Sequence, residues 1–234
     1  MRYCGVTAAQ GVLVLAMLEE VRTPEPPARL SAIFYEPGDA AQVSAELHRL
    51  DDVVVAVDGP LGPPQDGRGE RAADSLLRKR GVIPRVTTPE LNELSALLAG
   101  LGRFSPPGGD LEGVVGEGDY VEHPVFETNA DAVYCAMQGR RLPARRHPLG
   151  VQRRIDELEA DHVTDDGGDL WHRRIEELDA AAAALCAHRY AVGHASWLGD
   201  PDEGVIVLPG SSIPEEFSGR GVLPPVERLQ LPRA

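Results

Sequence analysis

Apolar residues occupy positions 53–57 without a polar interruption, and four of these five residues are β-branched valines. A short continuous run of this kind predicts a strand that is buried on both faces. Asp58 follows the run directly, and Gly59 and Pro60 then end the strand. The C-terminal ends of strands are where open α/β folds bind ligands, although an Asp-Gly turn is the commoner role of such a sequence. The pattern leaves both interpretations open.

The residues before this strand show the patterns of a strand meander and a helix. Three strands are predicted, at residues 2–8, 11–18 and 30–35. Val43 and Leu47 are four positions apart among polar residues, which is typical of a surface helix over residues 39–49. The chain up to Asp58 therefore predicts three strands, a helix and a fourth strand that ends in a carboxylate.

Helices dominate the pattern after Asp58. They are predicted at residues 70–80, 88–101, 127–138, 148–161 and 172–194. Short strands are expected at residues 119–122 and 203–208, and a loop rich in Gly and Pro at residues 102–118. Because no repeat or linker interrupts this order, we expect one α/β domain over residues 1–210 and a Pro-rich tail over residues 211–234.

Composition places the chain among ordinary globular proteins, with 42% hydrophobic and 26% charged residues. No apolar run approaches the roughly 20 residues that a membrane span requires. The apolar segment 11–18 is followed by two glutamates and has no cleavage site, so we interpret it as a strand of a cytoplasmic protein. The three cysteines are widely spaced and form no CxxC motif, which predicts reduced, buried thiols.

The net charge of −14 argues against tight non-specific binding of nucleic acid, which depends on Lys and Arg. Two local strips are nevertheless rich in basic residues. One contains Arg140, Arg141, Arg145, Arg146 and His147, and the other Arg68, Arg71, Arg78, Lys79 and Arg80. Solvated surface is the favoured interpretation of both strips, and a local contact with nucleic acid is the alternative.

Four acidic residues stand at positions where they could meet. Asp58 and Glu122 each end a predicted strand, whereas Glu176 and Asp179 are three apart in a predicted helix and project from one side of it. Ala180–Ala184 then form a small-residue surface that lets this helix lie close against a sheet. A carboxylate cluster of this kind requires a cation, and Mg²⁺ or Mn²⁺ suits it better than zinc. For the helix pair, acids that satisfy the helix dipole are an equally good interpretation.

The chain resembles the DUF429 family of predicted nucleases with a ribonuclease H-like fold. The resemblance lies in Ala56-Val-Asp-Gly-Pro-Leu-Gly62, Glu122-His-Pro124, the alanine-rich segment 177–190 and the Gly-Asp-Pro-Asp-Glu-Gly segment that begins at residue 199. It implies a mixed central sheet with a β-β-β-α-β core, flanked by helices. It also implies metal-dependent phosphodiester hydrolysis by ions about 4 Å apart. The implied catalytic residues are Asp58, Glu122 and Asp179, with Glu176 as a further metal ligand.

One position departs from that family pattern. The first strand normally carries an aspartate where this chain has Thr7. A threonine hydroxyl is a weak, neutral ligand, so the departure predicts an impaired nuclease. The alternative is a non-catalytic binding protein that keeps the fold, and small-molecule phosphate chemistry is a third option. No GxGxxG, GxxxxGK[ST] or GxSxG motif points to a dinucleotide enzyme, a P-loop enzyme or an α/β-hydrolase.

Overall fold

The computed structural model describes residues 1–22, 28–64, 69–107, 110–116, 121, 124–217 and 219. The strands are β1 (Arg2–Ala9), β2 (Val12–Val21), β3 (Arg29–Phe34), β4 (Val53–Asp58), β5 (Gly102–Arg103), β6 (Glu112–Val114), β7 (Pro124–Thr128), β8 (Val163–Asp165), β9 (Ala195–Leu198) and β10 (Ile206–Pro209). The helices are α1 (Ala40–His48), α2 (Ala72–Lys79), α3 (Pro89–Leu97), α4 (Ala130–Gln138), α5 (Pro148–Ala160) and α6 (Ile175–Ala191), with a 3₁₀ turn at Leu170–His172.

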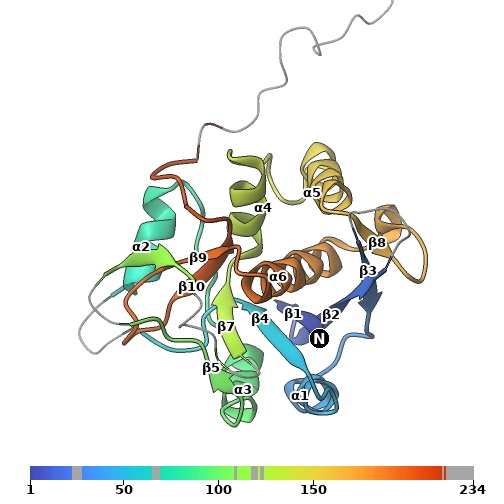
Figure 1. The fold of residues 1–234 in the computed structure, drawn as a ribbon, viewed down its shortest axis with the longest axis horizontal. Helices are drawn as coiled ribbons and strands as arrows, with labels where there is room; N and C mark the ends of the chain where they lie inside the picture. Colours follow the sequence, from blue (N-terminus) through green and yellow to red (C-terminus); the bar gives the residue numbers. More distant parts are fainter. Residues whose placement is uncertain are drawn as a thin grey trace, which may run out of the picture.

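The strands form one mixed sheet in the order β6-β9-β10-β7-β4-β1-β2-β3-β8, and β5 pairs with β7 (Figure 1). β1, β2 and β3 are antiparallel neighbours, while β4 is parallel to both β1 and β7. The predicted β-β-β-α-β order and the mixed sheet flanked by helices are therefore confirmed. β4 lies in the middle of the sheet, and all six of its residues are buried, as the uninterrupted valine run predicts.

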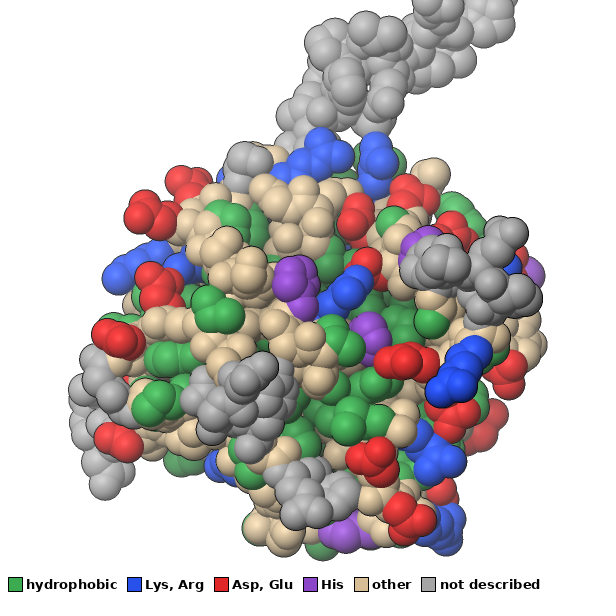
Figure 2. Space-filling view, viewed as in Figure 1, with side chains coloured by type: hydrophobic (Ala, Val, Ile, Leu, Met, Phe, Trp, Pro, Cys, Tyr) green, Lys and Arg blue, Asp and Glu red, His purple; other side chains and the backbone are tan. Residues whose placement is uncertain are grey.

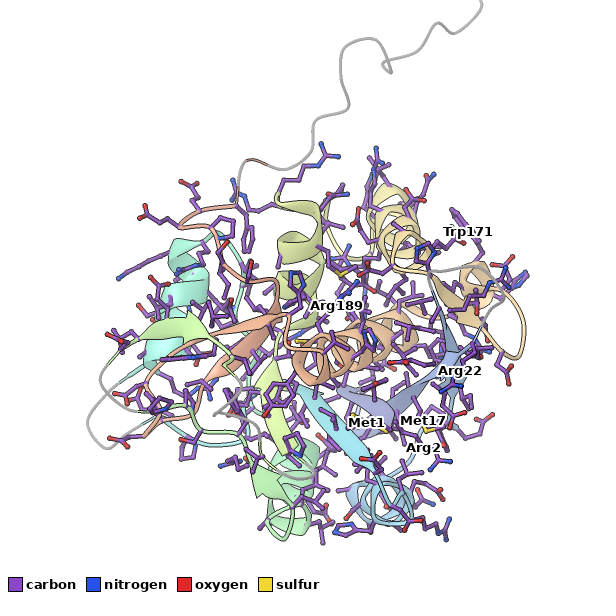
Figure 3. All side chains as sticks on the ribbon, viewed as in Figure 1. Met1, Arg2, Met17, Arg22, Trp171 and Arg189 are labelled. Atoms are coloured by element: carbon purple, nitrogen blue, oxygen red, sulfur yellow. The ribbon has the colours of Figure 1, made fainter. Side chains whose placement is uncertain are left out.

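Helices cover both faces of the sheet, and each face has its own apolar core. α6 lies across β1 and β4 and packs against α4 and α5, whereas α1 and α3 lie on the opposite face (Figure 1). Arg189, labelled in Figure 3, ties α6 to the end of α5 because its Nη2 donates to Asp161 Oδ1 at 2.6 Å. Phe217 is also completely buried in the core on the α6 face.

Small residues allow α6 to approach the sheet closely, as predicted. Ala180 to Ala184 are all completely buried. A Cβ atom on Gly5 of β1 would overlap the Ala180 carbonyl oxygen and the Ala184 backbone nitrogen. Only glycine fits at this crossing, so the contact fixes the depth at which α6 carries its side chains over the sheet.

Several predicted boundaries differ from the structure. The strand predicted at residues 119–122 falls almost entirely outside the described residues, and the strand of this region is β7 at Pro124–Thr128. The helix predicted from residue 127 begins only at Ala130, because the Asn129 side chain caps it by accepting from the Ala132 N–H. The predicted 102–118 loop contains the short strands β5 and β6, and β9 was not predicted.

All three cysteines are free and buried, as the sequence predicts. Among the described residues, no helix combines the length and apolar character needed to cross a membrane.

Candidate carboxylate site at the end of strand β4

Asp58 is the last residue of β4, and its side chain is completely buried. Its partners in register are Thr7 of β1 and Thr128 of β7. The Thr7 hydroxyl donates to Asp58 Oδ2 at 2.7 Å, and the backbone N–H of Ala130 donates to Oδ1 at 2.9 Å. Because Ala130 opens α4, the carboxylate also faces the positive end of a helix. These contacts hold Asp58 rigidly at the edge of the sheet.

Arg85 neutralises Asp58 and also reaches a second carboxylate. Its Nε lies 3.0 Å from Asp58 Oδ1, and its Nη2 lies 2.9 Å from Asp58 Oδ2. The same Nη2 lies 3.0 Å from Oδ2 of Asp179. The charge of Asp58 raises the pKa of Arg85. Asn129 anchors the segment that carries Arg85, because its Nδ2 donates to the Ile83 carbonyl at 3.3 Å.

Asp179 reaches this place from α6, with a completely buried side chain. Arg145 contacts its Oδ2 through Nε at 2.6 Å and Nη2 at 2.5 Å. Its Oδ1 is buried and has no hydrogen-bond partner among the described residues. Burial first, and then the charge of Asp58, raise the pKa of Asp179 to about 7. Two acidic residues from distant parts of the chain therefore share one cation.

Glu176 lies beside this pair, at the outer end of the cluster. Its Oε1 is 3.5 Å from Nη1 of Arg145 and 3.4 Å from Nη2 of Arg146. Arg145 thus links Glu176 to Asp179, which share one side of α6 as predicted. Glu122, the remaining predicted site residue, lies outside the described residues.

These oxygen donors suit a hard divalent cation, but their partners are arginines. Asp179 Oδ1 is a buried acceptor that no described group satisfies. Asp58, in contrast, accepts four hydrogen bonds or charged contacts, so its lone pairs are filled. In the described part of the chain, no group of three His, Cys, Asp or Glu residues is arranged to hold a metal ion. A divalent cation therefore fits between the two aspartates only when Arg85 leaves Asp58.

A family model described as "Protein of unknown function (DUF429)" matches residues 8–203. The chain belongs to the DUF429 family. Its structure is similar to the solved structure of RuvC from Thermus thermophilus, with 16% sequence identity and a TM-score of 0.40 over 82% of this chain and 95% of that chain. At that level the similarity does not establish a shared site or activity. None of the curated proteins compared with the chain matches it.

A second acid–arginine cluster of this DUF429 chain was not found from the sequence. Glu127 of β7 is buried, and its Oε1 accepts from the Leu61 N–H at 2.8 Å while its Oε2 lies 2.6 Å from Nη1 of Arg71. Arg71 also bonds Asp74 at 2.9 Å. Burial raises the pKa of Glu127, against the opposing effect of the Arg71 charge. Glu127 thereby anchors the loop that follows Asp58. Asn129 is a recognisable N-cap residue. Because the helix must start after it, this signal could have placed Glu127 in the preceding strand.

The two basic strips are only partly solvated surface. Arg71 and Arg80 are buried, and Arg80 pairs with Glu112 at 2.5 Å. Arg145 is 21% exposed and Arg146 is 70% exposed, and both face Glu176. On the face shown in Figure 2, acidic and basic side chains are interspersed. Many of these arginines therefore balance neighbouring acids.

Proposed function

We propose that this chain is a divalent-cation-dependent phosphodiesterase acting on nucleic acid, with Asp58 and Asp179 as its catalytic carboxylates. One observation supports this most strongly. Two completely buried carboxylates, delivered by a strand end and by a helix, converge on a single guanidinium group. Such a pair stays ionised in a low-dielectric site only beside a cation, which supports a cation-binding role for the C-terminal end of β4.

Asp58 and Asp179 would hold Mg²⁺ or Mn²⁺, and Glu176 and Glu122 are the proposed additional ligands. A divalent cation supplies Lewis acidity for activating water and for stabilising the leaving oxygen. Thr7 and the Ala130 N–H orient Asp58 for this role. Arg85 and Arg145 are 26% and 21% exposed, so both are accessible to phosphate oxygens, which guanidinium groups bind in bidentate fashion.

Thr7 sets an upper limit on the rate. It occupies the register position beside Asp58 where the family pattern has an aspartate, and it offers a hydrogen bond instead of a negative charge. We therefore propose a slow enzyme with one carboxylate ligand fewer than the ribonuclease H-like pattern implies.

The test is cleavage of short single- and double-stranded DNA and RNA in Mn²⁺, with purified wild type, Asp58→Asn and Asp179→Asn. Each substitution should reduce cleavage by about 10²-fold or more, because it removes a charge that acts on the reacting centre. Asp156→Asn is the matched control, since Asp156 lies on α5 and its Oδ2 is 3.7 Å from Nη1 of Arg153. Cleavage that survives unchanged in Asp58→Asn would overturn the proposal.

A second candidate function is a non-catalytic binding protein that retains the ribonuclease H-like fold. The four donors that fill the lone pairs of Asp58 favour it. Anomalous scattering from crystals soaked in Mn²⁺ separates the two functions. Two occupied sites at Asp58 and Asp179 would favour catalysis, whereas a soak that leaves Arg85 between the carboxylates would favour binding.

We also propose a cytoplasmic location, which the three free and buried cysteines support, because reduced thiols are typical of that compartment. The division into a domain over residues 1–210 and a tail over residues 211–234 stays a prediction.

A further inference from the structure

A cavity of about 250 Å³ lies beside the carboxylate site. It is bounded by residues 81–83, by α4, by the loop at residues 141–145 and by α5. Arg145 lines this cavity and also contacts Asp179, so the cavity adjoins the site through one side chain. Apart from Arg145, the residues that line this cavity have no part in the role proposed for Asp58 and Asp179.

Positive charge is in excess in this cavity. Three arginines line it, Arg141, Arg145 and Arg154, against one acid, Asp131. Arg154 is neutralised by Asp131 at 2.5 Å, and Arg145 by Asp179. Arg141 has no ion pair or side-chain hydrogen bond within the described ranges, although its Nε is buried. A partly buried cation with no counter-ion among the described residues is unusual in a chain of net charge −14, and its charge suits an anion.

Arg141 is also held in place by its packing. A Cβ atom on Gly81 would lie 2.8 Å from Cδ and 3.0 Å from Nη1 of Arg141, so the side chain packs directly over the glycine backbone. Gly81 has a φ of +83°, which favours glycine. Arg154 is 2% exposed, and its Nη1 donates to the Gly150 carbonyl at 2.8 Å. The cationic wall is therefore preorganised, which lowers the entropic cost of binding.

The remaining wall is apolar. Val82 and Leu142 are buried lining residues, and Ile83 is 76% exposed at the same cavity. Cys135 also lines it, and burial raises the pKa of its thiol to about 11, so the thiol adds no negative charge at neutral pH. A phosphate group matches the charge of Arg141 and the partly exposed guanidinium group of Arg145, and an attached organic group matches the apolar wall.

We propose that this cavity binds the phosphate monoester group of a nucleotide or of a nucleic-acid end, with Arg141 and Arg145 as the anion ligands. This binding requires neither a metal ion nor hydrolysis. Phosphate binding can therefore be measured in EDTA, which removes divalent cations. The result does not depend on whether the chain is a phosphodiesterase.

The experiment titrates the full chain by calorimetry in EDTA with inorganic phosphate, a nucleoside 5′-monophosphate and the same nucleoside without phosphate. Saturable binding is expected for both phosphates and not for the bare nucleoside. Arg141→Gln should weaken phosphate binding about ten-fold, the loss typical of one charge-assisted contact. Arg141→Lys, which keeps the charge, should recover part of it.

Arg140→Gln is the matched control, because Arg140 is adjacent but does not line the cavity, and its Nε bonds Gln138 at 3.2 Å. It should change affinity less than two-fold. Equal losses in the two variants would show that only general surface charge matters and would overturn the proposal, as would wild type that shows no saturable phosphate binding. Oligonucleotides with and without a 5′-phosphate then distinguish a nucleotide from a nucleic-acid end as the source of the bound phosphate. Tighter binding of the phosphorylated strand than of the mononucleotide indicates a nucleic-acid end.

Discussion

Two buried acid–arginine clusters lie at the ends of neighbouring strands, and they are built differently. At the end of β7, both oxygens of Glu127 have a donor, and Arg71 serves Glu127 and Asp74 with separate nitrogens. At the end of β4, Asp58 and Asp179 share Arg85 through one nitrogen, and Asp179 Oδ1 has no partner among the described groups. The first cluster is saturated, whereas the second keeps an unsatisfied acceptor.

This difference is the one expected between a structural cluster and a cluster with the functional role proposed for Asp58 and Asp179. A saturated buried ion pair holds the loop after Asp58 and offers nothing to a ligand. An unsatisfied carboxylate with a raised pKa is costly for the folded protein, and such costs are typical of sites that bind or react. The comparison therefore predicts that matched substitutions in the two clusters have unequal effects on stability.

The largest expected effect is the loss of Arg71. Arg71→Gln leaves Glu127 and Asp74 without their cation in a buried place, so it should lower the free energy of unfolding by about 3–5 kcal/mol. Arg85→Gln also removes the cation beside the buried Asp58, but Arg145 still pairs with Asp179 and Thr7 still bonds Asp58, so a smaller loss of about 2–3 kcal/mol is expected. Urea unfolding of both variants measures the difference. Equal losses of unfolding free energy in the two variants would show that the two clusters contribute equally to stability and would contradict the comparison.

A smaller effect of about 3 kcal/mol is expected where α6 crosses the sheet. Gly5→Ala places a methyl group against backbone atoms of Ala180 and Ala184, which cannot move as a flexible side chain can. The helix must shift, and Asp179 moves with it, so any Mn²⁺-dependent cleavage should fall together with stability. Gly100→Ala is the control, because nothing described lies within 4 Å of its new Cβ. A stable and fully active Gly5→Ala protein would contradict the close crossing as the device that positions Asp179.

The sequence predicts the scaffold of the site better than its electrostatics. The valine run and the alanine stripe fix β4 and α6, because burial on both faces and close helix–sheet packing leave clear compositional signals. Arg85 and Arg145 leave none. Both stand in segments without regular structure, where no periodicity indicates which acid an arginine will meet.

The position of β7 is a second feature that the sequence pattern predicts wrongly. Glu122 and Glu127 both end short apolar segments, and the Glu-His-Pro segment favours Glu122 as the site residue. The strand instead runs from Pro124 to Thr128, so Glu127 is the acid that the sheet buries. β9 was missed because its four residues are stabilised by pairing with β6 and β10, and this long-range pairing is invisible in a local pattern.

The last expected effect, which is the smallest over any single pH unit, is a pH dependence of stability in the metal-free protein. The pKa of Asp179 is about 7 in the folded state, against an ordinary value of 3.8. Between these values the folded state binds the proton more tightly than the unfolded state, so the free energy of unfolding falls as pH rises from about 4 to about 7. The slope from this group cannot exceed about 1.4 kcal/mol per pH unit. Urea unfolding in EDTA, with Asp179→Asn as reference, isolates it. Parallel pH curves for the two proteins would show that the unsatisfied carboxylate has no energetic cost, and the contrast with Glu127 would disappear.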